Sequence, residues 1–248
     1  MRKSILFIAL CGSCLCGCED FLTEDLQGTY SNSTFYRTAD HAELALTGIY
    51  NVVSFSDVRN NLWVFGDVAS DDAVKGGQPG DQNDIQFIDD FTYQPSNAYL
   101  NNIWKHYYEG ITRANYLVAS LPQIEMEQTR KDEIRGEALF LRSYFYFHLV
   151  NIFGELPLKL KPPLTSDQIH VPLSSIESVY TQIDEDLEVA ASVLQNERNG
   201  RVSAGAAWGL LAKSKLYQGA YQEVLSAIEE LEATGSYGLT TRYTDNFT

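Results

Sequence analysis

The sequence predicts a mainly α-helical protein built from tetratricopeptide-like helical hairpins, with a long irregular loop inserted among them. Apolar side chains recur every three or four residues along several long stretches, as they do on one face of a helix. Pro, Gly or Asn occurs at the ends of these stretches, where it favours the end of a helix. The composition, with 44% hydrophobic and 21% charged residues, is typical of a globular protein.

A first helix is predicted to begin at Thr38, which can act as its N-cap. Its apolar face is formed by Leu44, Leu46, Ile49, Tyr50 and Val53. From about residue 60 to residue 97, Asn, Asp and Gly become dense, which predicts a long loop. Ordered loops of this length are usually functional.

Helical periodicity returns over residues 98–121, where Pro122 ends it, and over residues 128–153, where Gly154 is a natural stop. The second segment is aromatic almost all round from residue 140 to residue 147. A helix of this kind is predicted to be buried on more than one side.

Four prolines between residues 155 and 173 predict an irregular connection. Ser174 and Glu177 then resemble a capping box that opens a helix extending to about residue 195. This helix is predicted to lead into the last part of the chain through a turn at Asn199-Gly200.

Two further helices are predicted at residues 203–218 and 220–234, separated by Gly219. Bulky and small side chains alternate along this pair as in a tetratricopeptide repeat, whose stacked pairs bury their cores against neighbours. Trp104 and Trp208 both fall on apolar helix faces, so we expect both in the core.

The N-terminus has the pattern of an export signal. Arg2 and Lys3 precede an apolar run, Ser4 to Leu10, that is too short to span a bilayer. No later segment of the sequence is long and apolar enough to span one either.

All four cysteines lie within the first 18 residues. The stretch Leu15-Cys16-Gly17-Cys18 resembles a bacterial lipobox, which makes residues 1–17 a signal peptide, Cys18 the lipid-bearing residue and residues 18–37 the anchor and tether. Anchoring at Cys14 or Cys16, or an ordinary signal peptide with incidental cysteines, are the alternatives. A metal-binding cysteine cluster is disfavoured because no matching second cluster follows.

The formal net charge of −15 argues against nucleic-acid binding, which needs clustered Lys and Arg, and is compatible with a neutral ligand such as a sugar. We predict no cofactor, no metal site and no catalysis. The sequence has no Gly-x-Ser-x-Gly motif, no phosphate-binding loop and no paired histidine ligands. A glycosidase needs only two carboxylates, so a hydrolase remains an alternative hypothesis.

Several stretches, in their order along the chain, resemble the N-terminal half of the SusD/RagB outer-membrane nutrient-binding lipoproteins. They are Cys18-Glu-Asp-Phe-Leu22, Ala69-Ser-Asp-Asp72, the segment from Trp104 to Asn115, the segment from Glu133 to Phe147, and the segment from Val202 to Lys213. The resemblance implies a lipid-anchored protein of the outer membrane, exposed at the cell surface. It also implies binding of an oligosaccharide or another nutrient and delivery to a TonB-dependent, SusC-like transporter.

Members of this family are considerably longer, and the present chain stops at Thr248. We therefore expect residues 38–248 to form the helical N-terminal domain of such a protein, apparently truncated. The alternative is a truncated helical-repeat adaptor that docks on the transporter without binding glycan.

Sugar recognition combines aromatic faces with planar polar side chains, and the loop at 60–97 supplies both. Its candidate ligand-binding residues are Trp63, Asp71, Asp72, Phe91, Tyr93 and Asn97. For each of them, packing within the loop or capping of a turn is the competing interpretation. Asp81, Asn83 and Asp84 are oxygen donors of the type that Ca²⁺ prefers, but their spacing lacks an EF-hand pattern, which favours a solvated loop.

Overall fold

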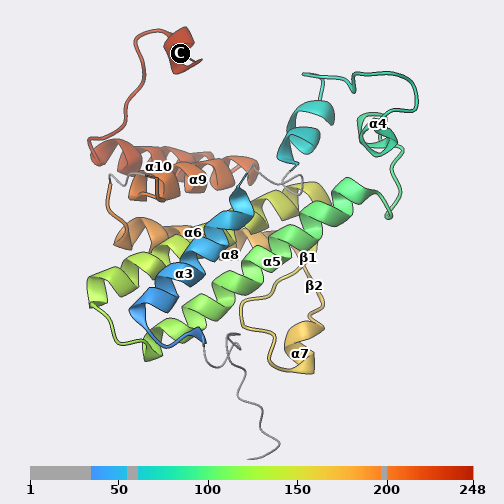
Figure 1. Ribbon diagram of the computed structural model, residues 1–248. Helices are drawn as coiled ribbons and strands as arrows, with labels where there is room; N and C mark the ends of the chain where they lie inside the picture. Colours follow the sequence, from blue (N-terminus) through green and yellow to red (C-terminus); the bar gives the residue numbers. More distant parts are fainter. Residues whose placement is uncertain (1–34, 55–60, 197–199, 248) are drawn as a thin grey trace, which may run out of the picture. The chain divides into compact units, whose positions relative to one another are not determined.

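The computed structural model describes residues 35–54, 61–196 and 200–247, and it confirms the mainly helical fold (Figure 1). The chain separates into two compact units, residues 1–35 and 36–248, and the helices described below belong to the second. The predicted signal peptide and the anchor at Cys18 lie outside the described residues. Within the described part, no helix combines the length and apolarity needed to cross a bilayer.

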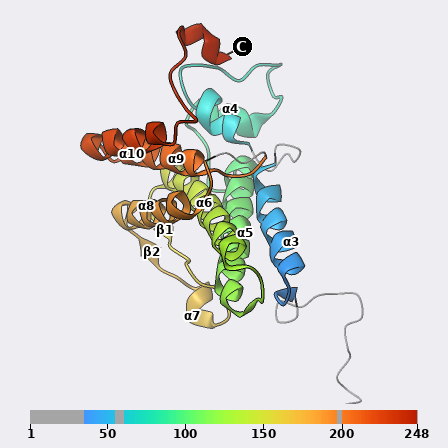
Figure 2. The same cartoon turned by 90° about the vertical axis from the view of Figure 1, so that its left-hand side faces the viewer.

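In the described part of the chain, six longer helices stack in sequence, as in a helical-repeat protein. They are α3 (Ala39–Tyr50), α5 (Ala98–Ser120), α6 (Gln128–Phe153), α8 (Ile176–Val193), α9 (Ala204–Tyr217) and α10 (Tyr221–Ala233). Both α3 and α5 contact α6, which contacts α8; α9 then packs on α8, and α10 on α9. Figure 2 shows this succession from α3 to α10, so the predicted stacked hairpins are confirmed.

Helix α6 lies at the centre because it is apolar on several sides, as its aromatic run predicts. Phe145 and Tyr146 are fully buried, and Tyr107 of α5 packs against Phe145 with ring centroids 5.1 Å apart. Close approach of the two helices depends on Gly110, where an added Cβ would lie 2.4 Å from the Phe145 ring. Gly154 has φ +78°, a left-handed conformation that ends α6 directly after Phe153.

The predicted N-cap of α3 is confirmed, and that of α8 is displaced by one residue. Thr38 caps α3, since its hydroxyl accepts a hydrogen bond from the His41 amide at 3.3 Å. Helix α8 is capped by Ser175, which accepts from the amide of Ser178, so the predicted capping box at Ser174 was wrong by one residue. Leu44 was also placed wrongly: it is 59% exposed, on the solvent side of α3.

The insertion at 60–97 contains two short helical segments that the sequence did not predict. These are the π-helix η4 (Val64–Val68) and the helix α4 (Asn83–Asp89), which bury a small core of their own. That core consists of Val64, Val68, Ile85 and Ile88. Each segment is too short for helical periodicity to stand out from the surrounding polar residues.

The connection at 155–173 likewise has more order than its prolines predict. Strand β1 (Leu156–Pro157) pairs antiparallel with β2 (Leu173–Ser174), and the short helix α7 (Ser166–Ile169) lies between them in the chain. Three 3₁₀ segments complete the described structure. They are η3 (Asn51–Val53), η5 (Leu121–Gln123) and η6 (Tyr243–Phe247).

We expect the stability of this fold to fall in mild acid because of His148. Its ring packs against those of Tyr144 and Phe147, with centroids 4.5 and 5.5 Å away. Burial, and secondarily the charge of Lys213, lower the pKa of His148 to about 4. The folded state therefore favours the neutral ring, so stability is complete above the unfolded pKa of about 6.5 and falls as the pH drops towards the folded pKa.

The expected loss between pH 7 and pH 5 is about 2 kcal/mol in the free energy of unfolding. Urea titrations at the two pH values measure it. The variant His148→Phe should lack this loss, whereas His170→Phe, at an exposed histidine, should keep it. Equal pH dependence of wild type and His148→Phe would contradict the assignment.

Candidate functional site

A cavity of about 550 Å³ lies where the start of α5 meets the end of α6. We call it the aromatic pocket. It is lined by Tyr93, Pro95, Leu100, Asn101, Trp104 and Phe153. Its volume is in the range of about 300–1,000 Å³ that is usual for small-molecule sites.

Hydrogen bonds from two asparagines fix the backbone that forms one side of the aromatic pocket. The side-chain oxygen of Asn97 accepts from the amides of Tyr99 and Leu100, which caps α5. The side-chain amide of Asn101 donates to the carbonyl oxygens of Pro95 and Asn97, at 3.1 and 3.0 Å. The turn before α5 is thereby fixed, which holds Tyr93 and Pro95 beside the first turns of the helix.

The opposite wall is a set of aromatic rings from two helices. Trp104 packs edge-to-face against Phe153, the last residue of α6, with centroids 5.0 Å apart. It also contacts Tyr108, at 4.8 Å, whose hydroxyl donates to the carbonyl of Pro157. The rings of α5 and α6 therefore support one another, and the carbonyl of Pro157 in β1 anchors the Tyr108 hydroxyl.

The lining of the aromatic pocket carries no charged side chain. Aromatic faces suit the C–H-rich faces of sugars, and an amide suits their hydroxyls. The Oδ1 atom of Asn101 accepts no hydrogen bond from the described residues, although its amide nitrogen is bonded twice. The arrangement can therefore bind a neutral, hydroxylated ligand.

The six residues that the sequence suggested as ligand contacts do not lie together in one cavity. Tyr93 lines the aromatic pocket and is 44% exposed. Trp63 lines a different cavity, described below, and Phe91 is 69% exposed with φ +53° after the end of α4. Asp71 and Asp72 are exposed and line neither cavity.

Asn97 belongs to the frame of the pocket. It is 4% exposed, its oxygen caps α5, and its amide donates to the carbonyl of Asp84 at 2.8 Å. These hydrogen bonds make Asn97 part of the framework that positions the loop. The amide of Ala98 donates to the carboxylate of Asp84, so one of the three Ca²⁺ candidates also serves as a cap. Within the described ranges, no group of His, Cys, Asp or Glu is arranged to hold a metal ion.

Sequence reasoning missed Trp104, which we expected in the core and which is only half-buried at the pocket wall. The core face of α5 is formed by Ile103, Tyr107 and Ile111, all fully buried. Leu100, Trp104 and Tyr108 recur at four-residue spacing and form a second stripe, which is the signal that could have revealed the wall. Trp208 is also half-buried, and it packs against a core cluster.

A second cavity, of about 280 Å³, lies in the insertion between η4 and α4. We call it the Trp63 pocket. Trp63, Lys75, Gln82 and Tyr99 are among the side chains that line it. Tyr99 belongs to the first turn of α5, whose next residues line the aromatic pocket.

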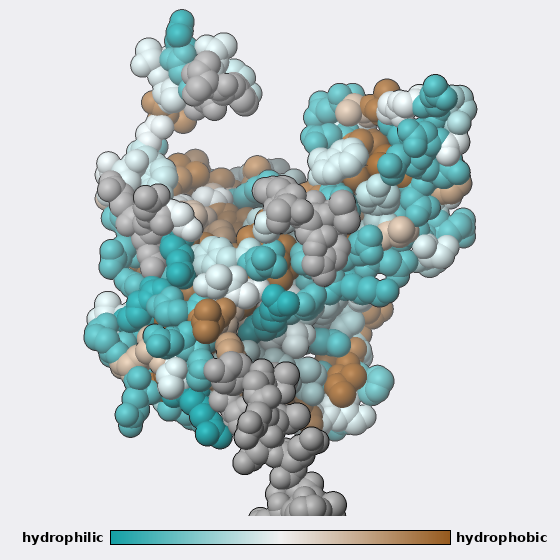
Figure 3. Space-filling model, in the orientation of Figure 1, coloured by the Kyte–Doolittle hydropathy of each residue, from teal (hydrophilic) through white to brown (hydrophobic). Residues whose placement is uncertain are grey.

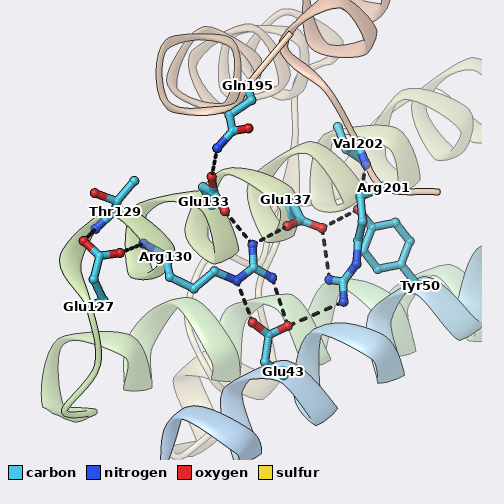
Figure 4. Close-up of polar contacts among 10 residues, drawn as sticks. All are labelled: Glu43, Tyr50, Glu127, Thr129, Arg130, Glu133, Glu137, Gln195, Arg201 and Val202. Atoms are coloured by element: carbon cyan, nitrogen blue, oxygen red, sulfur yellow. Dashed lines mark hydrogen bonds and ion pairs between the residues drawn. The ribbon is translucent and has the colours of Figure 1, made fainter. Parts of the chain in front are cut away.

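A network of ion pairs connects three parts of the chain (Figure 4). Arg130 contacts Glu43 through two nitrogens, at 2.6 and 2.9 Å, and also bonds Glu133 and Glu137. Arg201 contacts Glu137 at 3.3 Å. The network joins α3, α6 and the segment before α9.

The carboxylates of this network accept their hydrogen bonds from groups within it. The hydrogen bond from Arg130 holds the pKa of Glu43 below its usual value. Glu137 is fully buried and accepts the hydroxyl of Tyr50 at 2.6 Å.

A further surface feature is apolar. Figure 3 shows hydrophobic side chains gathered over α9 and α10. The exposed members on these helices are Leu216, Tyr217, Tyr221 and Leu225. Of the side chains of α10, Ala227 alone is buried among the described residues, so this last hairpin is covered on one side only.

Comparison with known proteins places the chain in the SusD-like family. Residues 25–217 match the SusD-like family described as "Starch-binding associating with outer membrane". SusD-like protein P38 of Formosa agariphila is 27% identical over 241 residues, which cover 96% of this chain and 47% of the relative. A SusD-like protein of Bacteroides ovatus is 27% identical over 218 residues, covering 86% and 39%.

Solved structures agree with this match. A laminarin-binding SusD-like protein superposes with a TM-score of 0.74 at 33% identity, covering 84% of this chain and 46% of that one. A SusD superfamily protein of Bacteroides vulgatus has a TM-score of 0.73 at 24% identity, over 88% and 47%, which supports the fold. The chain spans about half the length of the curated relatives it matches.

Proposed function

Because the chain belongs to the SusD-like family, we propose that it is a non-catalytic lipoprotein of the outer membrane, exposed at the cell surface. It binds an oligosaccharide or another nutrient and delivers it to a TonB-dependent, SusC-like transporter. The lipid is attached at Cys18, after a signal peptide of residues 1–17. The aromatic pocket is the observation that carries the binding part of this proposal.

The lining of the pocket supports a neutral glycan as the ligand. Tyr93 and Trp104 offer aromatic surface, Asn101 offers a hydrogen-bond acceptor, and no lining side chain is charged. The protein as a whole carries a net charge of −15, which would repel an acidic polysaccharide. A solved relative at 33% identity binds laminarin by its name, so laminarin, a neutral glucan, is the first ligand to test.

We expect Trp104→Ala and Tyr93→Ala each to weaken binding of laminarin by roughly tenfold to hundredfold, which corresponds to losing about 1.5–3 kcal/mol of aromatic burial. Isothermal titration calorimetry of the full chain measures the change. Phe87→Ala is the matched control, because Phe87 and Tyr93 are both 44% exposed and Phe87 lines neither cavity.

Wild-type affinity in both pocket variants would show that the aromatic pocket is not the binding site. Failure of the wild-type chain to bind laminarin or any glycan of an array would remove glycan binding from the proposal. Co-purification of the transporter with that chain would then favour the adaptor that docks without binding glycan.

A further inference from the structure

We propose that the loop from β1 to β2, residues 156–174, is a membrane-contact loop that rests the folded body on an anionic lipid surface. We call it the β1–β2 loop. Its exposed aliphatic side chains enter the boundary between headgroups and acyl chains, and its two lysines pair with lipid phosphates. This inference rests on the proposed function, because it presupposes that the chain is anchored at a membrane.

The first support is a group of large aliphatic side chains that face solvent. Leu164 is 72% exposed and Leu173 is 62% exposed, and Leu160 and Ile169 are exposed as well. Figure 3 shows hydrophobic side chains gathered around the position of α7, which belongs to this loop. Four such side chains on one short loop form a patch, which differs from the single exposed hydrophobes that every protein surface has.

The backbone that carries this patch is hydrogen-bonded to side chains of the loop and of α6. The amides of Leu164 and Thr165 both donate to the side-chain oxygen of Gln168, at 2.9 Å. The Tyr146 hydroxyl donates to the carbonyl of Lys159 at 2.9 Å and accepts from its amide at 2.7 Å. A loop that is already hydrogen-bonded has less conformational entropy to lose when its side chains insert.

The second support is a cavity of about 220 Å³ within the β1–β2 loop, where two lysines adjoin aliphatic surface. Its lining includes Lys159, Lys161 and Asp167, together with the aliphatic side chains Leu158, Leu160 and Val171. Lys161 is exposed and forms no ion pair within the described part of the chain. Ammonium groups beside aliphatic side chains match a phospholipid, in which a phosphate adjoins acyl chains.

The third support is the distribution of charge over the molecule. Residues 61–97 carry seven aspartates and a single basic residue, Lys75, and α10 carries four glutamates and no basic residue. The β1–β2 loop carries two lysines and one aspartate. Figures 1 and 2 show α4 and α10 at one end of the helical stack, and α7 with the start of α3 at the other. An anionic surface therefore favours approach from the side of the loop over approach from the side of α4 and α10.

The composition of the patch favours lipid over a protein partner. Between residues 156 and 174 there is no Phe, Tyr, Trp or Arg. Protein interfaces concentrate Tyr, Trp and Arg at the positions that carry most of the binding energy, and Leu is under-represented there. Aliphatic side chains accompanied by lysines are typical of segments that lie at a bilayer surface.

The test uses the mature lipoprotein in vesicles made of equal parts of phosphatidylcholine and phosphatidylglycerol. No cysteine follows Cys18, so a single introduced cysteine is the site of labelling with a thiol-reactive fluorophore once Cys18 carries lipid. Leu164→Cys reports on the β1–β2 loop. Leu225→Cys is the matched control, because it replaces an exposed leucine of α10. Spin-labelled lipids quench a fluorophore that lies in the bilayer boundary.

We expect the spin-labelled lipids to quench the fluorophore at Leu164→Cys and to leave that at Leu225→Cys unaffected. Adding Lys161→Glu should lower the quenched population by about tenfold, because one positive charge is removed and one negative charge is added. Lys105→Glu makes the same change of charge at an exposed lysine of α5 and should have no effect. Unchanged thermal unfolding of Lys161→Glu shows that its effect reflects membrane contact.

Equal quenching at the two labelled positions, or none at Leu164→Cys in protein that floats with the vesicles, would overturn the membrane contact and leave the lipid anchor intact. Protein that did not float with the vesicles would overturn both the anchor and the contact. Quenching that Lys161→Glu left unchanged would overturn the pairing of the lysines with phosphate. A dimer of the wild type that Leu164→Asp dissociated, without quenching, would assign the patch to a second copy of the chain instead.

Discussion

Replacing Arg142 with alanine is expected to lower the free energy of unfolding by about 3–5 kcal/mol. Arg142 is 6% exposed and forms a two-bond contact with Asp186, Nε to Oδ2 and Nη2 to Oδ1, each at 2.7 Å. Its third nitrogen donates to Asn115 at 2.7 Å. Without the guanidinium, the carboxylate of Asp186, itself 5% exposed, remains buried with its charge uncompensated.

Urea unfolding followed by circular dichroism measures this loss. Arg135→Ala is the matched control, because Arg135 lies exposed on the same helix. The double variant Arg142→Met with Asp186→Leu should be more stable than Arg142→Ala, since it removes both charges. A free energy of unfolding for Arg142→Ala within about 0.5 kcal/mol of the wild type would contradict the account.

Replacing Arg130 with alanine is expected to lower the free energy of unfolding by about 2–3 kcal/mol at neutral pH. The loss is smaller than for a fully buried ion pair, because the Arg130 side chain is 26% exposed and solvent screens its charge. Glu43, Glu133 and Glu137 would lose their shared guanidinium, leaving Arg201 as the remaining cation of the network. Mutual repulsion of the three carboxylates then destabilises the junction of α3 and α6.

The pH dependence of the Arg130→Ala deficit tests this cause. In the wild type the pKa of Glu43 is lowered, so its stabilising contribution is present above the unfolded pKa of about 4.5 and is lost as the pH falls through the folded pKa. The deficit of Arg130→Ala relative to the wild type, measured by urea unfolding, should therefore shrink towards pH 4. A deficit that stayed constant from pH 7 to pH 4 would show that lost packing, and not charge, is its source.

The predictable parts of the fold were its long periodic elements. Helix α6 begins and ends where the sequence predicts, because a strong apolar period precedes Gly154. Helix α4 and the strand pair β1–β2 were not predicted, because a few residues among prolines, glycines and aspartates give no period to recognise. The charged contacts were equally hidden, since Arg142 and Asp186 lie far apart in the sequence and meet only when α6 packs on α8.

Of the candidate site, the sequence predicted only the part contributed by the loop before α5. Tyr93 stood out as an aromatic residue within a polar loop, and the structure places it in the aromatic pocket. Phe153 could not be found in this way, because it reaches the pocket from the far end of another helix. Trp104 was misjudged because helical periodicity identifies an apolar position without showing whether a neighbour covers it.

The most direct test of the central claim is a crystal structure of the chain with laminarihexaose bound. The account predicts a glucose ring against Trp104 and Tyr93 in the aromatic pocket, with a hydroxyl donating to the Oδ1 atom of Asn101. A hexasaccharide bound elsewhere on the protein, with the aromatic pocket empty, would contradict it.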